Sequence, residues 1–121
     1  WHVVTTLPEM MARTGLHLSS VDGEAPVPAR AADIAAAYGR AAAELAERLA
    51  AEWTDETLAV TDNLYGETWP RGMTLRVLLL HEIHHRGQMT ALMRLAGLRV
   101  PGTYGPARED WAAMGMTPPA V

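Results

Sequence analysis

One long helix over residues 74–96 constrains the fold of this chain more than any other feature of the sequence. Its apolar positions step by four and three residues, which is the pattern of a helix that turns one face into a bundle core. The stripe consists of Thr74, Leu78, His81, His85, Gln88, Leu92 and Leu95. We expect Thr74 to cap the start of this helix and Gly97 to end it. A stripe of this length needs other helices to cover it.

Two further helices are predicted upstream. Residues 1–14 place Val3, Val4, Leu7, Met10 and Met11 on one face, although Pro8 is expected to kink this helix. Residues 30–52 are rich in alanine and therefore strongly helical by propensity. Residues 54–73 read as a long irregular connection, and a short helix is expected over residues 106–114. The sequence thus predicts an all-α protein.

The composition excludes several classes of protein. A chain of 121 residues favours a single domain, residues 1–121. It has no Cys, which excludes disulfides and thiolate metal ligands, and its net charge of −4 argues against nucleic acid as a partner. It has neither a membrane-spanning apolar run nor the start of a signal peptide, so we expect no membrane partner and a cytoplasmic location.

The apolar stripe is interrupted by His81 and His85, which lie four residues apart on one face of the predicted helix. Two imidazoles at this spacing lie close enough to bind one metal ion. Such an ion would also satisfy polar groups that are costly to bury alone. The alternative is a pair of core histidines that bond to backbone or water. Since two interrupt one stripe, we favour a metal.

A metal site needs at least one more protein ligand. His84 lies about 100° around the helix from His85, so it is expected at the surface or beside the site. His17 follows Gly15 in a loop, whereas His2 lies on the first predicted helix and is the better candidate. Glu67 and Glu109 are carboxylate alternatives.

The run His81-Glu82-Ile83-His84-His85 also matches the H-E-x-x-H pattern of zinc peptidases. Glu82 would then be the general base that acts on zinc-bound water. The pattern is short, and the longer H-x-x-G-x-x-H extension does not follow it. An ion pair between Glu82 and Arg86, one turn apart, explains the glutamate more simply, so the peptidase is the weakest of the functional readings.

The segment from Leu79 to Gln88, Leu-Leu-His-Glu-Ile-His-His-Arg-Gly-Gln, followed by Leu95-Ala96-Gly97-Leu98, resembles the DinB/YfiT-like superfamily of metal-binding helical bundles. Trp1-His2-Val3-Val4 is similar to the family's other ligand-bearing helix. The resemblance covers essentially the whole chain and implies His2, His81 and His85 as the metal ligands. It also implies that Gly87 lets a neighbouring helix approach, that Gln88 hydrogen-bonds near the site, and that Arg86 orients an anionic substrate unless it pairs with Glu82.

The resemblance implies an up-down-down-up four-helix bundle, often a homodimer. That fold has a helix before the first ligand which the present sequence lacks, so an N-terminally truncated DinB-like domain is expected. Exposed apolar surface would then be covered by a partner chain or a swapped element.

Three functions remain open from the sequence. The first, which the resemblance implies, is a metal-dependent transferase or a hydrolase-like enzyme, in which the metal activates a low-molecular-weight thiol or water for attack on a small-molecule substrate. The second is a non-catalytic metal-binding bundle of the stress-response type, and the third is a helical interaction module with buried histidines. Imidazole ligands suit Zn, Ni, Cu or Fe, of which Zn and Ni are preferred here. Whether the chain is an enzyme is left undecided.

Overall fold

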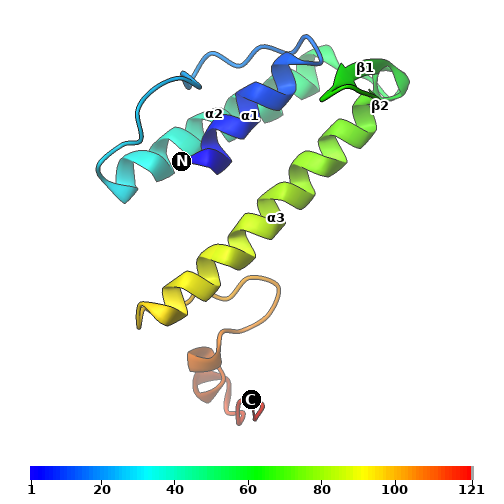
Figure 1. Ribbon diagram of the computed structural model, residues 1–121. Coiled ribbons are helices and arrows are strands. Elements are labelled where there is room, and N and C mark those ends of the chain that lie inside the picture. The colour runs from blue at the N-terminus through cyan, green and yellow to red at the C-terminus, as the bar shows by residue number, and fades with distance from the viewer. Residues whose placement is uncertain (121) are drawn as a thin grey trace. The chain divides into compact units, whose positions relative to one another are not determined.

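A computed structural model of the chain describes residues 1–120. The chain divides into two compact units, Trp1–Glu82 and Ile83–Val121, with the boundary inside the long helix α3. Both are mainly helical, and the first also contains a small two-stranded sheet (Figure 1). No described helix is long and apolar enough to cross a membrane.

The core of the first unit forms where α1 (His2–Ala12) packs along α2 (Ala31–Glu52) (Figure 1). The buried side chains of α1 follow the predicted helical face, and the helix continues through Pro8. They meet two small residues of α2, Ala37 and Ala41, that let the helices approach closely. The loop after α1 and the start of α3 complete this core, whose members include Val4, Leu7, Met10, Met11, Leu16, Leu18, Val21, Leu64 and Leu78. The first two predicted helices are thus confirmed to within a few residues.

The connection over residues 54–73 is more ordered than the sequence analysis predicts. It contains a short 3₁₀ helix, η1 (Thr57–Ala59), and an antiparallel hairpin of β1 (Thr61–Leu64) and β2 (Glu67–Pro70). Two residues form the turn, Tyr65 and Gly66, with φ of 56° and 87°. Positive φ at both positions is typical of a type I′ turn, which matches the twist of paired strands. Glycine adopts it at no cost, but tyrosine rarely does, so the sequence signal for this hairpin is weak.

The helix α3 (Arg71–Leu95) begins three residues earlier than predicted. Thr74 therefore does not cap it but lies inside it, fully buried, because Arg71 already continues from β2 and pairs with Asp62 of β1 at 2.8 Å. Gly97 ends the helix with φ of 69°, as expected. The predicted stripe is buried at Thr74 and Leu78, whereas Leu92 and Leu95 are 64% and 86% exposed.

The second unit pairs the last turns of α3 with the segment that follows. The predicted helix over residues 106–114 is two separate 3₁₀ turns, η2 (Arg108–Asp110) and η3 (Ala112–Met114), with a left-handed Gly115 at the end. Ion pairs join Arg94 to Glu109 and Arg99 to Asp110. The protein is therefore mostly helical rather than strictly all-α, and the up-down-down-up arrangement of four helices stays a prediction.

The hairpin contributes Leu64 to the core, so shortening this buried side chain should destabilise the whole first unit. Leu64 is fully buried, so Leu64→Ala should lower the free energy of unfolding by about 2–5 kcal/mol, measured by urea denaturation. Leu79→Ala, at a position 64% exposed, is the matched control and should cost under about 0.5 kcal/mol. Equal effects of the two substitutions would contradict the packing of β1 described above.

Candidate metal centre

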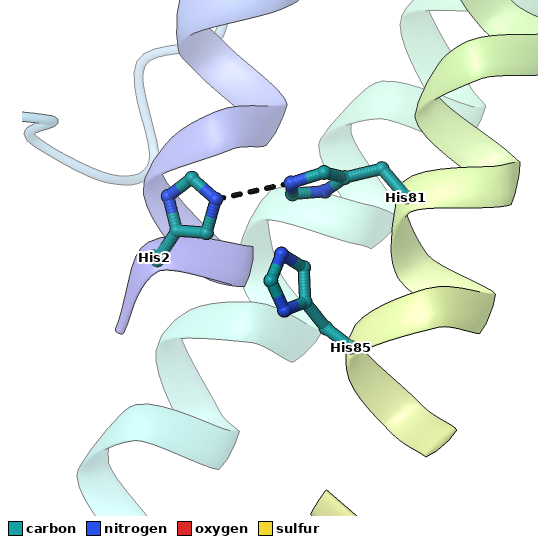
Figure 2. Close-up of side chains that lie close together, drawn as sticks. All are labelled: His2, His81 and His85. Carbon is teal, nitrogen blue, oxygen red and sulfur yellow. Dashed lines mark hydrogen bonds between the residues drawn. The ribbon is translucent and has the colours of Figure 1, made fainter. Parts of the chain in front are cut away.

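Three histidines from distant parts of the sequence converge in space. His2 lies in the first turn of α1, and His81 and His85 lie on α3 (Figure 2). Each offers one ring nitrogen, and these nitrogens all lie within 4.8 Å of one another. Nε2 of His2 is 3.0 Å from Nε2 of His81, across 79 residues of sequence. The structure thus brings together the three residues that the sequence analysis singled out as ligands.

Helix geometry accounts for two of the three positions. Since α3 is unbroken from Arg71 to Leu95, side chains four residues apart stand one turn apart on the same face. His81 and His85 are half-buried, while His2 is exposed. The group is therefore partly exposed to solvent, most of all at His2.

The donors present fit a divalent cation. In a tetrahedral zinc site with Zn–N bonds of about 2.0–2.1 Å, ligand nitrogens lie about 3.4 Å apart. The contact of 3.0 Å and the outer limit of 4.8 Å bracket that separation, so small side-chain rotations suffice to bind an ion. Three imidazoles also leave at least one coordination position for water or substrate, as catalytic zinc sites do.

Polar neighbours hold two of the rings in a useful orientation. Nδ1 of His85 lies 2.7 Å from Oε1 of Gln88, an oxygen that can only accept a hydrogen bond. Thr6 donates its hydroxyl hydrogen to the His2 carbonyl at 2.9 Å, so its oxygen can accept from Nδ1 of His2 at 3.4 Å. A proton on Nδ1 leaves Nε2 of each ring with a lone pair for a metal.

The sequence analysis anticipated the contact of Gln88 but overlooked Thr6. The spacing of the two residues could have predicted this contact, because Thr6 lies four residues after His2 and so on the same face of a helix. Thr6 is one of the buried residues of α1.

The other candidate ligands lie outside this group of three. His84 is exposed, with its ring 5.1 Å from that of His85, and His17 is an exposed loop residue. Glu67 accepts a hydrogen bond from the Trp69 indole at 2.8 Å, and Glu109 pairs with Arg94. That pairing lowers the pKa of Glu109 to about 2.

Two residues near the histidine group, Gly87 and Arg86, have surroundings that differ from those predicted from the sequence. Among the described residues, no segment other than α3 itself lies within 4 Å of the Cβ that alanine would add at Gly87, so no neighbouring helix is packed against this glycine here. Arg86 donates to the Tyr104 hydroxyl at 2.9 Å and lies over its ring. Glu82 is half-buried on α3.

Comparison with known proteins shows the family to which the chain is related. The model of the DinB family matches residues 1–119. The uncharacterized protein YrdA of Bacillus subtilis (strain 168) is 43% identical over 121 residues, which cover 100% of this chain and 72% of that protein. The crystal structure of a DinB-like protein from Bacillus cereus ATCC 10987 is similar with a TM-score of 0.79 and 42% identity, over 86% of this chain and 69% of that one.

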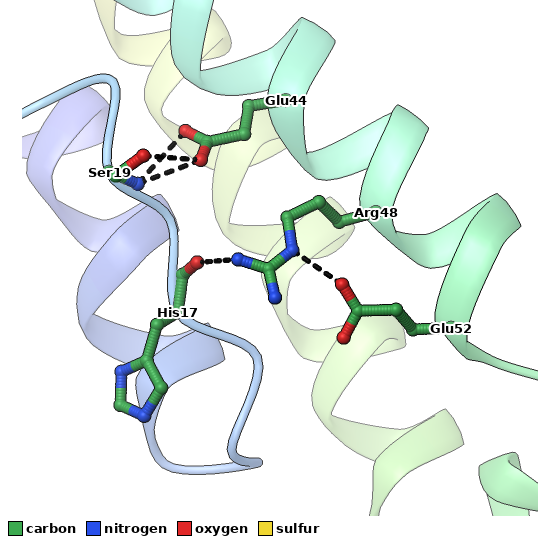
Figure 3. Close-up of polar contacts among 5 residues, drawn as sticks. All are labelled: His17, Ser19, Glu44, Arg48 and Glu52. Carbon is green, nitrogen blue, oxygen red and sulfur yellow. Dashed lines mark hydrogen bonds and ion pairs between the residues drawn. The ribbon is translucent and has the colours of Figure 1, made fainter.

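The position of His2 depends on the position of α1. Contacts between α2 and the loop that follows α1 hold α1 against α2, and we call these contacts the loop clamp. The loop after α1 is tied to α2 by Glu44, whose carboxylate accepts a hydrogen bond from the backbone N–H of Ser19 at 2.8 Å (Figure 3). It accepts another from the backbone N–H of Ser20 at 2.8 Å. Arg48 donates to the carbonyl oxygen of His17 and pairs with Glu52 at 2.6 Å. The loop is thereby fixed along α2 while Leu16 and Leu18 enter the core.

The clamp should make stability depend on pH. Hydrogen bonds from the Ser19 N–H first, and then from Ser20, lower the pKa of Glu44 from 4.5 to about 2. Folding thus favours the ionised carboxylate, so the stabilisation is complete above about pH 4.5 and is lost as the pH falls toward 2.

We expect Glu44→Gln to lower the free energy of unfolding at pH 7 by about 1–2 kcal/mol, because a charged acceptor of two N–H groups is replaced by a neutral one. The difference from wild type should shrink between pH 4.5 and 2. Glu47→Gln, on the exposed face of α2, is the control and should change little. A Glu44→Gln difference that is constant with pH would show that the clamp does not depend on the charge.

Proposed function

The chain belongs to the DinB family, and we propose that it binds one divalent metal ion through His2, His81 and His85. The observation that carries the proposal is the convergence of three imidazole nitrogens within 4.8 Å from two helices. Imidazole binds a metal ion as the neutral ring, so three such donors leave the charge of the cation uncompensated. Zn and Ni are the preferred ions, because imidazole suits both.

For the reaction, we propose transfer of a low-molecular-weight thiol to an electrophilic small molecule. When bound, the metal would supply a lowered thiol pKa and so a thiolate nucleophile at neutral pH. The chain has no Cys, so the thiol must come from a substrate. Gln88 and Thr6 hold the rings of His85 and His2, and the exposed side of His2 leaves the approach to the site open.

Two other functions compete with this one. Activation of water would make the chain hydrolase-like at the same three histidines. A non-catalytic bundle would bind metal and be stabilised by it without turning over any substrate. A peptidase with Glu82 as its general base lacks support beyond the five-residue pattern. Metal content separates a metal protein from a plain interaction module, and a thiol assay separates the enzyme from the passive binder.

Protein purified without a nickel column should contain about one divalent metal ion per chain by elemental analysis. His81→Ala and His2→Ala should each lose most of it, because two imidazoles hold an ion far more weakly than three. His84→Ala is the matched control, since this exposed histidine is next to His85 but outside the group, and it should retain the metal. Equal metal in wild type and His81→Ala would refute the site, while retention in His2→Ala alone would refute only the third ligand.

The metal-loaded protein should accelerate the reaction of a small thiol such as glutathione with a chloroarene. In that reaction an S–C bond forms, the C–Cl bond breaks, chloride leaves and the thiol proton passes to solvent. We expect turnover to depend on both thiol and metal and to fall at least about 100-fold in His81→Ala. Metal uptake with a rise in Tm but no turnover on a panel of thiols and esters would favour the passive binder instead.

A further inference from the structure

The second unit contains a hollow that the histidine group does not use. It has a volume of about 170 Å³ and is formed between the middle of α3 and the loop that follows this helix. Its lining residues are Ile83, Arg86, Gly87, Thr90, Thr103 and Tyr104. None of them is a histidine, and Arg86 stands about 100° around α3 from His85. We propose that this hollow binds a small organic carboxylate, independently of the metal.

The polar groups of the hollow are suited to a carboxylate. Arg86 presents a planar guanidinium with five N–H donors, and it directs one of them, on Nη2, at the Tyr104 hydroxyl oxygen at 2.9 Å. Tyr104 accepts that bond and keeps its own hydrogen to donate. A guanidinium and a phenol that point into one space can bind both oxygens of a carboxylate, which is the geometry for which arginine is best fitted.

The other walls of the hollow favour a ligand whose remaining part is apolar. The guanidinium carbon of Arg86 lies 4.9 Å from the centroid of the Tyr104 ring, so the stacked pair forms one flat wall. Ile83 adds an aliphatic surface that is otherwise 42% exposed. Pockets for drug-sized molecules begin at about 300 Å³, so a hollow of 170 Å³ is suited to a smaller ligand of the size of benzoate.

Gly87 is the residue of α3 that lines the hollow without a side chain. Glycine inside a helix is less favourable than alanine, and no described segment other than α3 itself would touch a Cβ at this position. Packing therefore does not explain the glycine. Because Gly87 lines the hollow, the missing side chain keeps open a space that even a methyl group would narrow.

Benzoate binding to the full chain, measured by titration calorimetry at pH 7, tests the proposal. Arg86→Gln should weaken the affinity about tenfold or more and Tyr104→Phe about threefold, because each removes hydrogen bonds to a charged acceptor. Gly87→Ala should weaken binding and at the same time raise Tm, a combination that a purely structural role for Gly87 would not give. Arg76→Gln, at an exposed arginine on the same helix, is the matched control and should bind as wild type does.

Binding should persist in His81→Ala, and this separates the hollow from the metal centre. Loss of benzoate binding in that variant would assign the ligand to the histidine site and overturn the proposal. The proposal is also refuted if wild type does not bind benzoate at millimolar concentration, or if Arg86→Gln binds it unchanged. Tighter binding of inorganic phosphate than of benzoate would overturn the assignment to a carboxylate with an apolar body.

Discussion

The packing of α1 on α2 is the constraint on which the histidine group depends. His2 is exposed and is not one of the buried core residues, so its position follows largely from the helix that carries it. Val4, Leu7 and Met11 fix that helix by burying their side chains against α2 and the loop between the two helices. Burial of three such side chains contributes several kcal/mol, which is far more than any single hydrogen bond at the site. The first turn of α1 can therefore hold the exposed His2 in a defined position.

The sequence predicts the part of the histidine group that lies within a single helix. Histidines four residues apart on a strongly periodic helix have only one relative placement, so His81 and His85 follow from spacing alone. The choice of His2 over Glu67 and Glu109 did not follow from spacing, since it depends on how α1 lies in space. His2 was preferred because it lies on the first predicted helix, and the family resemblance then implied it as the third ligand. The structure places its Nε2 3.0 Å from that of His81.

Sequence reasoning failed where distant residues decide a local conformation. The hairpin of β1 and β2 turns through Tyr65 at positive φ, and no propensity favours a tyrosine there. Its hydroxyl donates to Glu9 of α1 at 2.8 Å, and Arg13 of α1 lies 4.5 Å from the centroid of its ring. These contacts are made to another element, so they were invisible in the segment itself. The observed start of α3 differs from the predicted one for the same reason. The ion pair of Arg71 with Asp62 extends the helix back to the hairpin.

The chemistry of the three histidines also determines which reactions the proposed metal centre would favour. Three neutral imidazoles would leave a bound divalent ion with its full charge, whereas a site with a carboxylate ligand would cancel part of it. A centre of this kind favours anionic ligands, such as a thiolate or a hydroxide, over neutral ones. Nδ1 of His85 faces the uncharged amide of Gln88 rather than a carboxylate, so its hydrogen-bond partner adds no negative charge. Three neutral ligands would therefore make the proposed centre electrophilic, which is the property that transfer of a thiol taken from a substrate requires.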